Sequence, residues 1–379
     1  MTAIELWAAA ASSAFLVDDR WIDRARQTGH HERLDDLDRL AALGARRVRF
    51  PVAWPRVASS STSAPDWRWS DVRLGRLGEL NVGAIVGLLD GSAPAHLDPS
   101  DAKFVVGFAD WAGTVAERYG WIDDWTPIHA PQAAARRMIG RHDLALFLRT
   151  VVRASAAINA AMLRIRAVVP NARLVHTEAI GRIGSTDALA LRCAFANDLR
   201  WLALDLLCGR VVADHPLRER IERAGIAARE LDELVARPCV PDVIGIDYEP
   251  GSDRFLDDRL DRWAASTWTG DGDATWAEVP ALRRGPIAGH RAALEDVWSR
   301  YRRPLALTHS HLGGTREAQM RWLDAAWSAA AEARITGIEV EAVTVSAAFG
   351  VVHRAAAGGH YECGAYDVRA GVPRPTAIA

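Results

Sequence analysis

The feature that most constrains this chain is an eightfold alternation of short β-like runs with longer amphipathic segments. Several runs are bounded by Gly or Pro, and the spacing leaves room for a helix between one run and the next. In the segment 30–45, for example, Leu34, Leu37 and Leu40 recur at helical spacing, and Gly44 is placed to end the helix. The expected strands are 4–10, 47–52, 84–89, 123–128, 173–177, 242–247, 304–309 and 341–346.

Eight consecutive strand and helix units predict an α/β fold of the (β/α)8 or TIM-barrel class. A doubly wound sheet is the alternative, but no Gly-x-Gly-x-x-Gly follows the first run. A chain of 379 residues with 49% hydrophobic residues can fill one large core, so we expect a single domain over residues 1–379. The segment 265–285, rich in Gly, Asp and Thr, is expected to be a long surface loop.

Composition argues against several classes of partner. The 46 basic and 48 acidic residues give a formal net charge of −2, without a long Lys or Arg run, so we expect no nucleic-acid partner. No uninterrupted apolar run approaches the ~18 residues of a spanning helix, so we expect no membrane partner. The N-terminus lacks the basic region of a signal peptide, and the four cysteines form no Cys-x-x-Cys pair. These features predict a cytoplasmic protein with reduced cysteines and no cofactor.

Polar residues follow most of the expected strands. In a (β/α)8 barrel the reactive groups lie where the strands end at their C-terminal mouths, because eight loops converge there. By the alternation of strand residues, Arg49 is also expected to point inward from the second strand. The candidates read from the strand ends are Asp90, His129, His176, Glu178, Asp247, Tyr248, His309 and His311.

Four segments in colinear order carry a resemblance to a known family. They are "RVRFPVAWPRV" (47–57), "ERYGWIDDWTPIHAPQ" (117–132), "DVIGIDYEP" (242–250) and "PLALTHSHLGG" (304–314). They resemble segments of family-one glycoside hydrolases, the β-glucosidase-like retaining enzymes built on a (β/α)8 barrel. The resemblance covers nearly the whole chain, and it implies the same barrel.

A more specific resemblance is to the glycosidase-like barrel that occurs fused to dTDP-4-dehydrorhamnose reductase-type domains. It rests on segments such as "GHHERLDDLDRLAALG" (29–44), "WLALDLLCGRV" (201–211) and "LGGTREAQMRWL" (312–323). This resemblance implies a setting in nucleotide-sugar metabolism and a reductase partner.

The chain departs from the glycosidase pattern where the chemistry is decided. A retaining glycosidase uses two carboxyl groups about 5–5.5 Å apart, one as nucleophile and one as acid and then base. At the position implied for the acid/base glutamate this chain has Ala130, and at the position implied for the nucleophile it has His309. Imidazole cannot offset an oxocarbenium charge as a carboxylate does. The resemblance therefore implies the scaffold, without retaining hydrolysis.

Two readings of the mouth stay open. In the first, the barrel is catalytically degenerate and binds a sugar, a sugar nucleotide, an anionic ligand or a partner protein through Arg49, Asp90, His129, Tyr248, His309 and His311. In the second, it is an active enzyme on a carbohydrate-like or anionic substrate, with Glu178, Asp247 or Asp90 as relocated acid and base. His309 and His311 are also two residues apart, a spacing found in metal sites, but we expect no bound metal.

Overall fold

The computed structural model describes residues 3–17, 20–58, 64–94, 96–140, 143–353 and 360–379. Eight parallel strands close into a barrel, in the order β1-β14-β13-β9-β7-β6-β5-β4. The prediction of a (β/α)8 barrel is confirmed, and each expected run overlaps one barrel strand. The strands are β1 (Glu5–Ala9), β4 (Arg47–Pro51), β5 (Gly83–Leu89), β6 (Asp124–Ile128), β7 (Arg173–Ala179), β9 (Val243–Asp247), β13 (Leu305–His309) and β14 (Val340–Val345).

Inward-pointing side chains fill the barrel, so it is a packed core and not a pore. One layer of this core contains a tryptophan among smaller aliphatic residues, all of them at most 1% exposed: Trp7, Ile85, Val175, Val243, Ala306 and Ala342. In β7 and β9 the alternation that starts at these residues carries Thr177 and Gly245 inward as well. The strand pattern therefore determines which side chains reach the mouth of the barrel.

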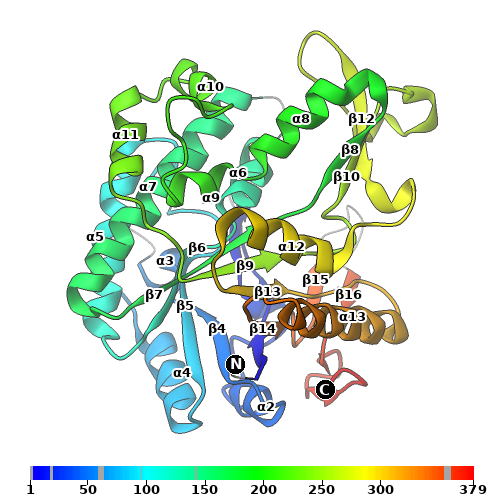
Figure 1. Ribbon diagram of the computed structural model, residues 1–379. Coiled ribbons are helices and arrows are strands. Elements are labelled where there is room, and N and C mark those ends of the chain that lie inside the picture. The colour runs from blue at the N-terminus through cyan, green and yellow to red at the C-terminus, as the bar shows by residue number, and fades with distance from the viewer. Residues whose placement is uncertain (1–2, 18–19, 59–63, 95, 141–142, 354–359) are drawn as a thin grey trace.

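Helices surround the barrel (Figure 1). The segment expected as a helix from residue 30 is helical only from Asp36, because His30 and Arg33 turn back to bind the buried Asp36 carboxylate. The helices are α1 (Arg24–Gln27), α2 (Asp36–Ala42), α3 (Trp54–Val57), α4 (Arg68–Glu79), α5 (Ala102–Arg118), α6 (Pro131–Ile139), α7 (Leu144–Val168), α8 (Ala190–Leu199), α9 (Leu202–Leu207), α10 (Arg218–Arg223), α11 (Ala228–Ala236), α12 (Gly289–Tyr301) and α13 (Arg316–Ile335).

Helix α7 is the one helix of the described chain that is long and apolar enough to cross a membrane. Its most apolar window has a mean hydropathy of 1.3, and 61% of that window is buried inside the fold. The helix packs against α5, α6 and α9. This burial is typical of a core helix.

A small outer sheet projects beside the barrel (Figure 1). It consists of β11 (Trp268–Gly270), β12 (Thr275–Pro280), β10 (Arg254–Asp257) and β8 (Ile183–Ser185), in that order. The prediction of a loop over 265–285 is therefore wrong in its middle part. The residues from 275 to 280 alternate between solvent and the sheet interior, and they pair with the strand that follows β9.

Three two-stranded ribbons complete the described fold. The first, β2 (Ala14–Val17) with β3 (Arg20–Asp23), lies between β1 and α1. The other two are β15 (Val351–His353) with β16 (His360–Glu362), and β17 (Tyr366–Asp367) with β18 (Arg374–Pro375). Ala14 also bridges to Gly91 beyond β5, which brings the first ribbon to the mouth.

Candidate functional site

A cavity of about 400 Å³ opens at the C-terminal ends of the barrel strands. This is the end where barrel enzymes of this class hold their ligands, and the volume lies within the range of small-molecule sites. Charged and imidazole groups from five strand ends meet small residues in its wall. Its lining includes Ala9, Ser12, Ser13, Phe15, Arg24, Arg49, Asp90, His129, Ala130, Arg137, Asp247, Glu249, Ser252, His309 and Ser346.

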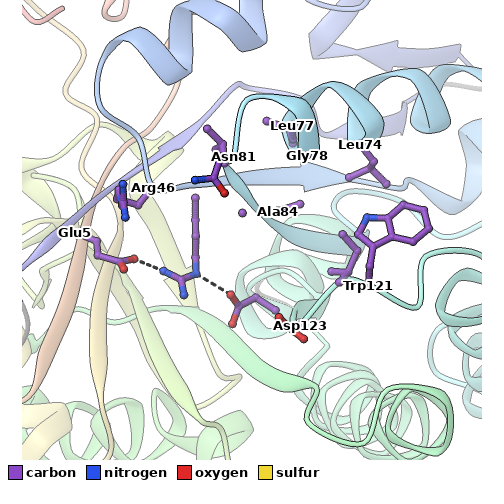
Figure 2. Close-up of a pocket in the computed structure, with 14 residues that line it drawn as sticks. Glu5, Arg46, Leu74, Leu77, Gly78, Asn81, Ala84, Trp121 and Asp123 are labelled. Carbon is purple, nitrogen blue, oxygen red and sulfur yellow. Dashed lines mark hydrogen bonds and ion pairs between the residues drawn. The ribbon is translucent and has the colours of Figure 1, made fainter.

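A second cavity, of about 390 Å³, lies at the opposite end of the barrel (Figure 2). Figure 2 shows Glu5, Asn81 and Trp121 around it. At its floor Arg47 donates hydrogen bonds to Glu5 and, over 2.8 Å, to Asp124, so this arginine is neutralised within the wall. The two cavities have similar volumes, so volume does not show which one binds a ligand. At the N-terminal end the opposite charges are paired with one another, which is typical of a stabilising role.

Arg49, His129 and Asp247 form a polar cluster in the mouth. Nη2 of Arg49 lies 2.8 Å from Nδ1 of His129, and an arginine can only donate. Nδ1 therefore accepts, and it also accepts from the hydroxyl of Thr177 over 2.7 Å. The imidazole proton then sits on Nε2, 3.2 Å from Oδ2 of Asp247. The other carboxylate oxygen of Asp247 accepts from Thr308 over 2.8 Å.

Burial and the neighbouring charges determine the protonation state of the His129 imidazole. Burial, followed by the positive charge of Arg49, lowers the pKa of His129 to about 3. His129 is therefore neutral at physiological pH, with one defined tautomer. Its Nε2–H group lies beside the Asp247 carboxylate. His129 does not serve as a general base, because the lone pair on Nδ1 already accepts from Arg49 and Thr177.

His309 and Glu249 form a second pair on the wall. Nε2 of His309 lies 2.6 Å from Oε1 of Glu249. Burial acts to lower the pKa of His309, but the hydrogen bond and charge of Glu249, with the charge of Asp247, outweigh it and raise the pKa above its ordinary value. The strand register shifts between Leu307 and His309, which turns His309 toward the cavity next to Asp247.

Ala130 stands at the position that the resemblance implies for the acid/base glutamate. It precedes Pro131, the first residue of α6, and adopts the left-handed backbone conformation with φ 42° and ψ 63°. Its backbone N–H donates to the carbonyl of Thr177, and its side chain is a buried methyl group in the cavity wall. No proton can be given to a ligand from this side chain.

Five of the residues selected from the sequence line this one cavity. They are Arg49, Asp90, His129, Asp247 and His309. Within this cavity Arg49 donates its hydrogen bond to the imidazole of His129.

Glu178 lies outside the cavity wall. Thr177 points into the mouth, so the next residue points outward, where the Glu178 carboxyl accepts from the backbone N–H of Gln132 over 3.0 Å. Burial raises the pKa of Glu178 to about 8, against the opposing effect of that N–H. Its proton is buried among backbone groups and does not face a ligand.

Three more residues expected at the mouth also lie elsewhere. Tyr248 is buried, donates to Asp253 over 2.7 Å and accepts from the backbone N–H of Gly289. Nε2 of His311 lies 3.5 Å from Glu362, beside a separate small cavity. His176 is 1% exposed.

Arg24, Arg137 and Phe15 belong to the cavity but were not selected from the sequence. Arg24 follows the first ribbon, and Arg137 lies in the last turn of α6, so neither is near a barrel strand in the chain. No local pattern could have found them, because the folding of α6 and the ribbon over the mouth brings them together. No group of three or more His, Cys, Asp or Glu side chains that could hold a metal ion occurs within the described residues.

Comparisons with known proteins agree with the fold. No family model and no curated protein matches the chain in sequence. Among solved structures, a family 1 β-glucosidase from Thermotoga maritima superposes with a TM-score of 0.76 at 16% identity, over 99% of this chain and 95% of that chain. A β-glucosidase from the same organism in complex with azafagomine gives 0.77 at 15%, over 100% and 96%. This chain has the barrel of family 1 β-glucosidases, and at this identity the likeness establishes the fold alone.

Proposed function

We propose that this protein binds a carbohydrate-like small molecule at the mouth of its barrel and does not cleave glycosides by double displacement. The proposed ligand-binding side chains are Arg49, Asp90, His129, Asp247 and His309. One observation carries the proposal: at the ends of β6 and β13 the cavity wall presents the methyl group of Ala130 and the imidazole of His309. The resemblance assigns the two catalytic carboxylates of a retaining glycosidase to these positions.

The remaining acidic groups support the same view. Retaining hydrolysis needs one ionised carboxylate free to attack and one protonated carboxyl group on the far side of the scissile bond. Asp247 already accepts from Thr308 and lies beside the His129 imidazole, and Glu249 pairs with His309. Asp247 ends β9 and Glu249 lies two residues beyond it, so both stand on one side of the mouth.

Binding a polyhydroxylated ligand suits the remaining geometry. His129 and Asp247 are held rigidly, and a fixed arrangement of donors and acceptors is what recognises sugar hydroxyls with little loss of side-chain entropy. An adjoining cavity of about 260 Å³ shares Ala133, Ala179 and Ser252 with the mouth and extends to the outer sheet. The two cavities together offer room for a ligand as large as a sugar nucleotide. Such a ligand agrees with the resemblance to reductase-fused barrels, and we propose a cytoplasmic setting for it.

A second candidate function rests on Asp90 and Asp247. They line the same cavity from the ends of β5 and β9, which are separated by β6 and β7 in the barrel. An enzyme with relocated acid and base would use this pair. Glu178 is not part of this candidate, because its carboxyl group lies behind the wall.

A panel of nitrophenyl glycosides, combined with thermal melts in the presence of free sugars and deoxynojirimycin, tests the proposal. We expect no turnover of any glycoside and a rise in melting temperature with at least one sugar. Asp247→Asn should abolish that rise, while Asp110→Asn, on the exposed face of α5, should not.

Turnover that is lost in Asp247→Asn and kept in Asp110→Asn would establish the second candidate instead. A covalent glycosyl adduct detected by mass spectrometry would contradict the proposal outright.

A further inference from the structure

Two arginines share one aromatic ring at the rim of the mouth cavity. The guanidinium carbon of Arg24 lies 5.4 Å from the ring centroid of Phe15, and that of Arg137 lies 5.8 Å from the same centroid. All three residues line the cavity. They come from α1, α6 and β2, and the backbone N–H of Arg24 is tied to the carbonyl of Ser13, another residue of the wall.

Neither guanidinium is neutralised within the described part of the chain. Neither Arg24 nor Arg137 forms an ion pair or a side-chain hydrogen bond with any described residue, although most arginines of this protein do. The cavity carboxylates Asp247 and Glu249 are engaged by His129, Thr308 and His309. Asp90 and Glu249 attract Arg24 only from beyond contact distance.

The two positive charges repel each other. Burial is the largest cause that lowers the pKa of Arg24, and the charge of Arg137 lowers it further. Like charges held together beside a concave surface raise the local concentration of counter-ions and favour an anion between them. Phe15 offers both guanidinium planes a surface on which to stack, so their N–H groups remain free to point into the cavity.

We propose that Arg24 and Arg137, stacked on Phe15, form a subsite for a phosphate monoester carried by the ligand. The inference rests on the proposed function, because it assigns the charged end of the molecule that the mouth binds. A carboxylate is satisfied by one guanidinium fork, whereas the three terminal oxygens of a phosphate monoester accept from two forks at once. Two arginines without an ion-pair partner among the described residues, both beside the Phe15 ring, therefore fit a phosphate better than a carboxylate.

Isothermal titration of the full chain with glucose, glucose 1-phosphate, glucose 6-phosphate, glucuronate and inorganic phosphate tests the subsite. The two sugar phosphates present the group at opposite ends of the sugar. We expect at least one of them to bind more tightly than glucose, and Arg24→Gln and Arg137→Gln each to weaken that binding by about tenfold or more. Glucose binding should stay unchanged in both variants.

Arg220→Gln is the matched control, since Arg220 also lies over a phenylalanine ring, that of Phe195, away from this cavity. It should leave every affinity unchanged.

The outcomes separate the two proposals. If glucose and the sugar phosphates bind equally well in the wild type, the subsite is refuted and the proposed function stands. If inorganic phosphate alone binds and needs both arginines, the subsite stands and carbohydrate binding fails. A gain with glucuronate but with neither sugar phosphate overturns the assignment to phosphate, and an absence of all binding overturns both.

Discussion

At the scale of single residues, neighbouring titratable groups behave in opposite ways. Burial lowers the pKa of the His129 imidazole to about 3 and raises the pKa of the Glu178 carboxyl group to about 8. Both groups are thereby kept uncharged at neutral pH. The neutral His129 accepts hydrogen bonds from Arg49 and Thr177 within the mouth. Glu178 has no comparable role in the cavity, so its burial is a cost that a substitution should relieve.

Glu178→Gln is expected to stabilise the protein increasingly as the pH rises. The folded-state pKa of Glu178 is raised from 4.5 to about 8, so the fold favours the protonated acid. Its contribution to stability is present below pH 4.5 and is lost as the pH rises toward 8, by at most about 1.4 kcal/mol per pH unit. Glutamine stays neutral throughout. Thermal melts of both proteins across this range measure the difference.

A gap in melting temperature that does not change between acidic and alkaline buffers would contradict this view of Glu178. Ligand binding should be the same in both proteins, because the side chain does not line the cavity.

At the scale of elements, one glycine in β9 lets two neighbouring strands support the mouth. A Cβ atom on Gly245 would lie 2.7 Å from Oγ1 and Cγ2 of Thr308 and 2.9 Å from Cγ2 of Thr177. These two threonines hold Asp247 and His129 through their hydroxyl groups. The space left by the missing side chain therefore determines where the two threonines hold His129 and Asp247.

Gly245→Ala is expected to destabilise the protein by about 1–3 kcal/mol, because the threonines must move in a closely packed interior. It should also weaken ligand binding, since the supports of His129 and Asp247 are displaced. Chemical denaturation measures the first effect, and titration with whichever sugar or sugar phosphate binds the wild type measures the second.

Gly87→Ala is the matched control in β5. A Cβ there would lie 3.8 Å from its nearest neighbour, the carbonyl of Thr126, which is an ordinary contact. This variant should be neutral or more stable by up to about 1 kcal/mol. Equal effects of the two substitutions would show that the threonines are not constrained.

At the scale of the whole molecule, three buried neutral histidines make the fold sensitive to acid. Burial is the largest cause that lowers the pKa of His129 and His176 to about 3 and of His290 to about 4. Each is ordinarily half-protonated at 6.5 in the unfolded chain, so each contributes stability above that pH and loses it as the pH falls. Glu178, with the opposite sign, offsets one of the three.

His176→Leu is expected to stabilise the protein at neutral pH, and the gain should grow as the pH falls below 6.5. Neither ring nitrogen of His176 has a hydrogen-bond partner within the described structure, so an apolar side chain of similar size removes an uncompensated polar group. The added gain is up to about 1.4 kcal/mol per pH unit. His360→Leu, at an exposed position, serves as control, and a constant difference between pH 7 and pH 5 would count against this explanation.

Much of the site could be predicted once the strands were located. Arg49, His129, Asp247 and His309 all reach one cavity, because strand ends converge in a closed barrel. Glu178 and Tyr248 show the limit of that reasoning. Each directly follows an inward-pointing neighbour, and a shift of one residue in a strand sends a side chain to the opposite face. A one-residue error in a strand end predicted from sequence is therefore enough to assign Glu178 or Tyr248 to the wrong face.

The sequence by itself determined the architecture of this protein. The alternation of apolar runs with amphipathic segments is a local property of the chain, so it can be recognised without knowing any tertiary contact. It also determined that a methyl group and an imidazole stand where the resemblance expects carboxylates. Only the tertiary structure decided which polar side chains face the cavity and which are neutral. Arg24, Phe15 and Arg137 meet across more than a hundred residues of chain, and burial, which sets the charge of His129 and Glu178, exists only once the elements pack.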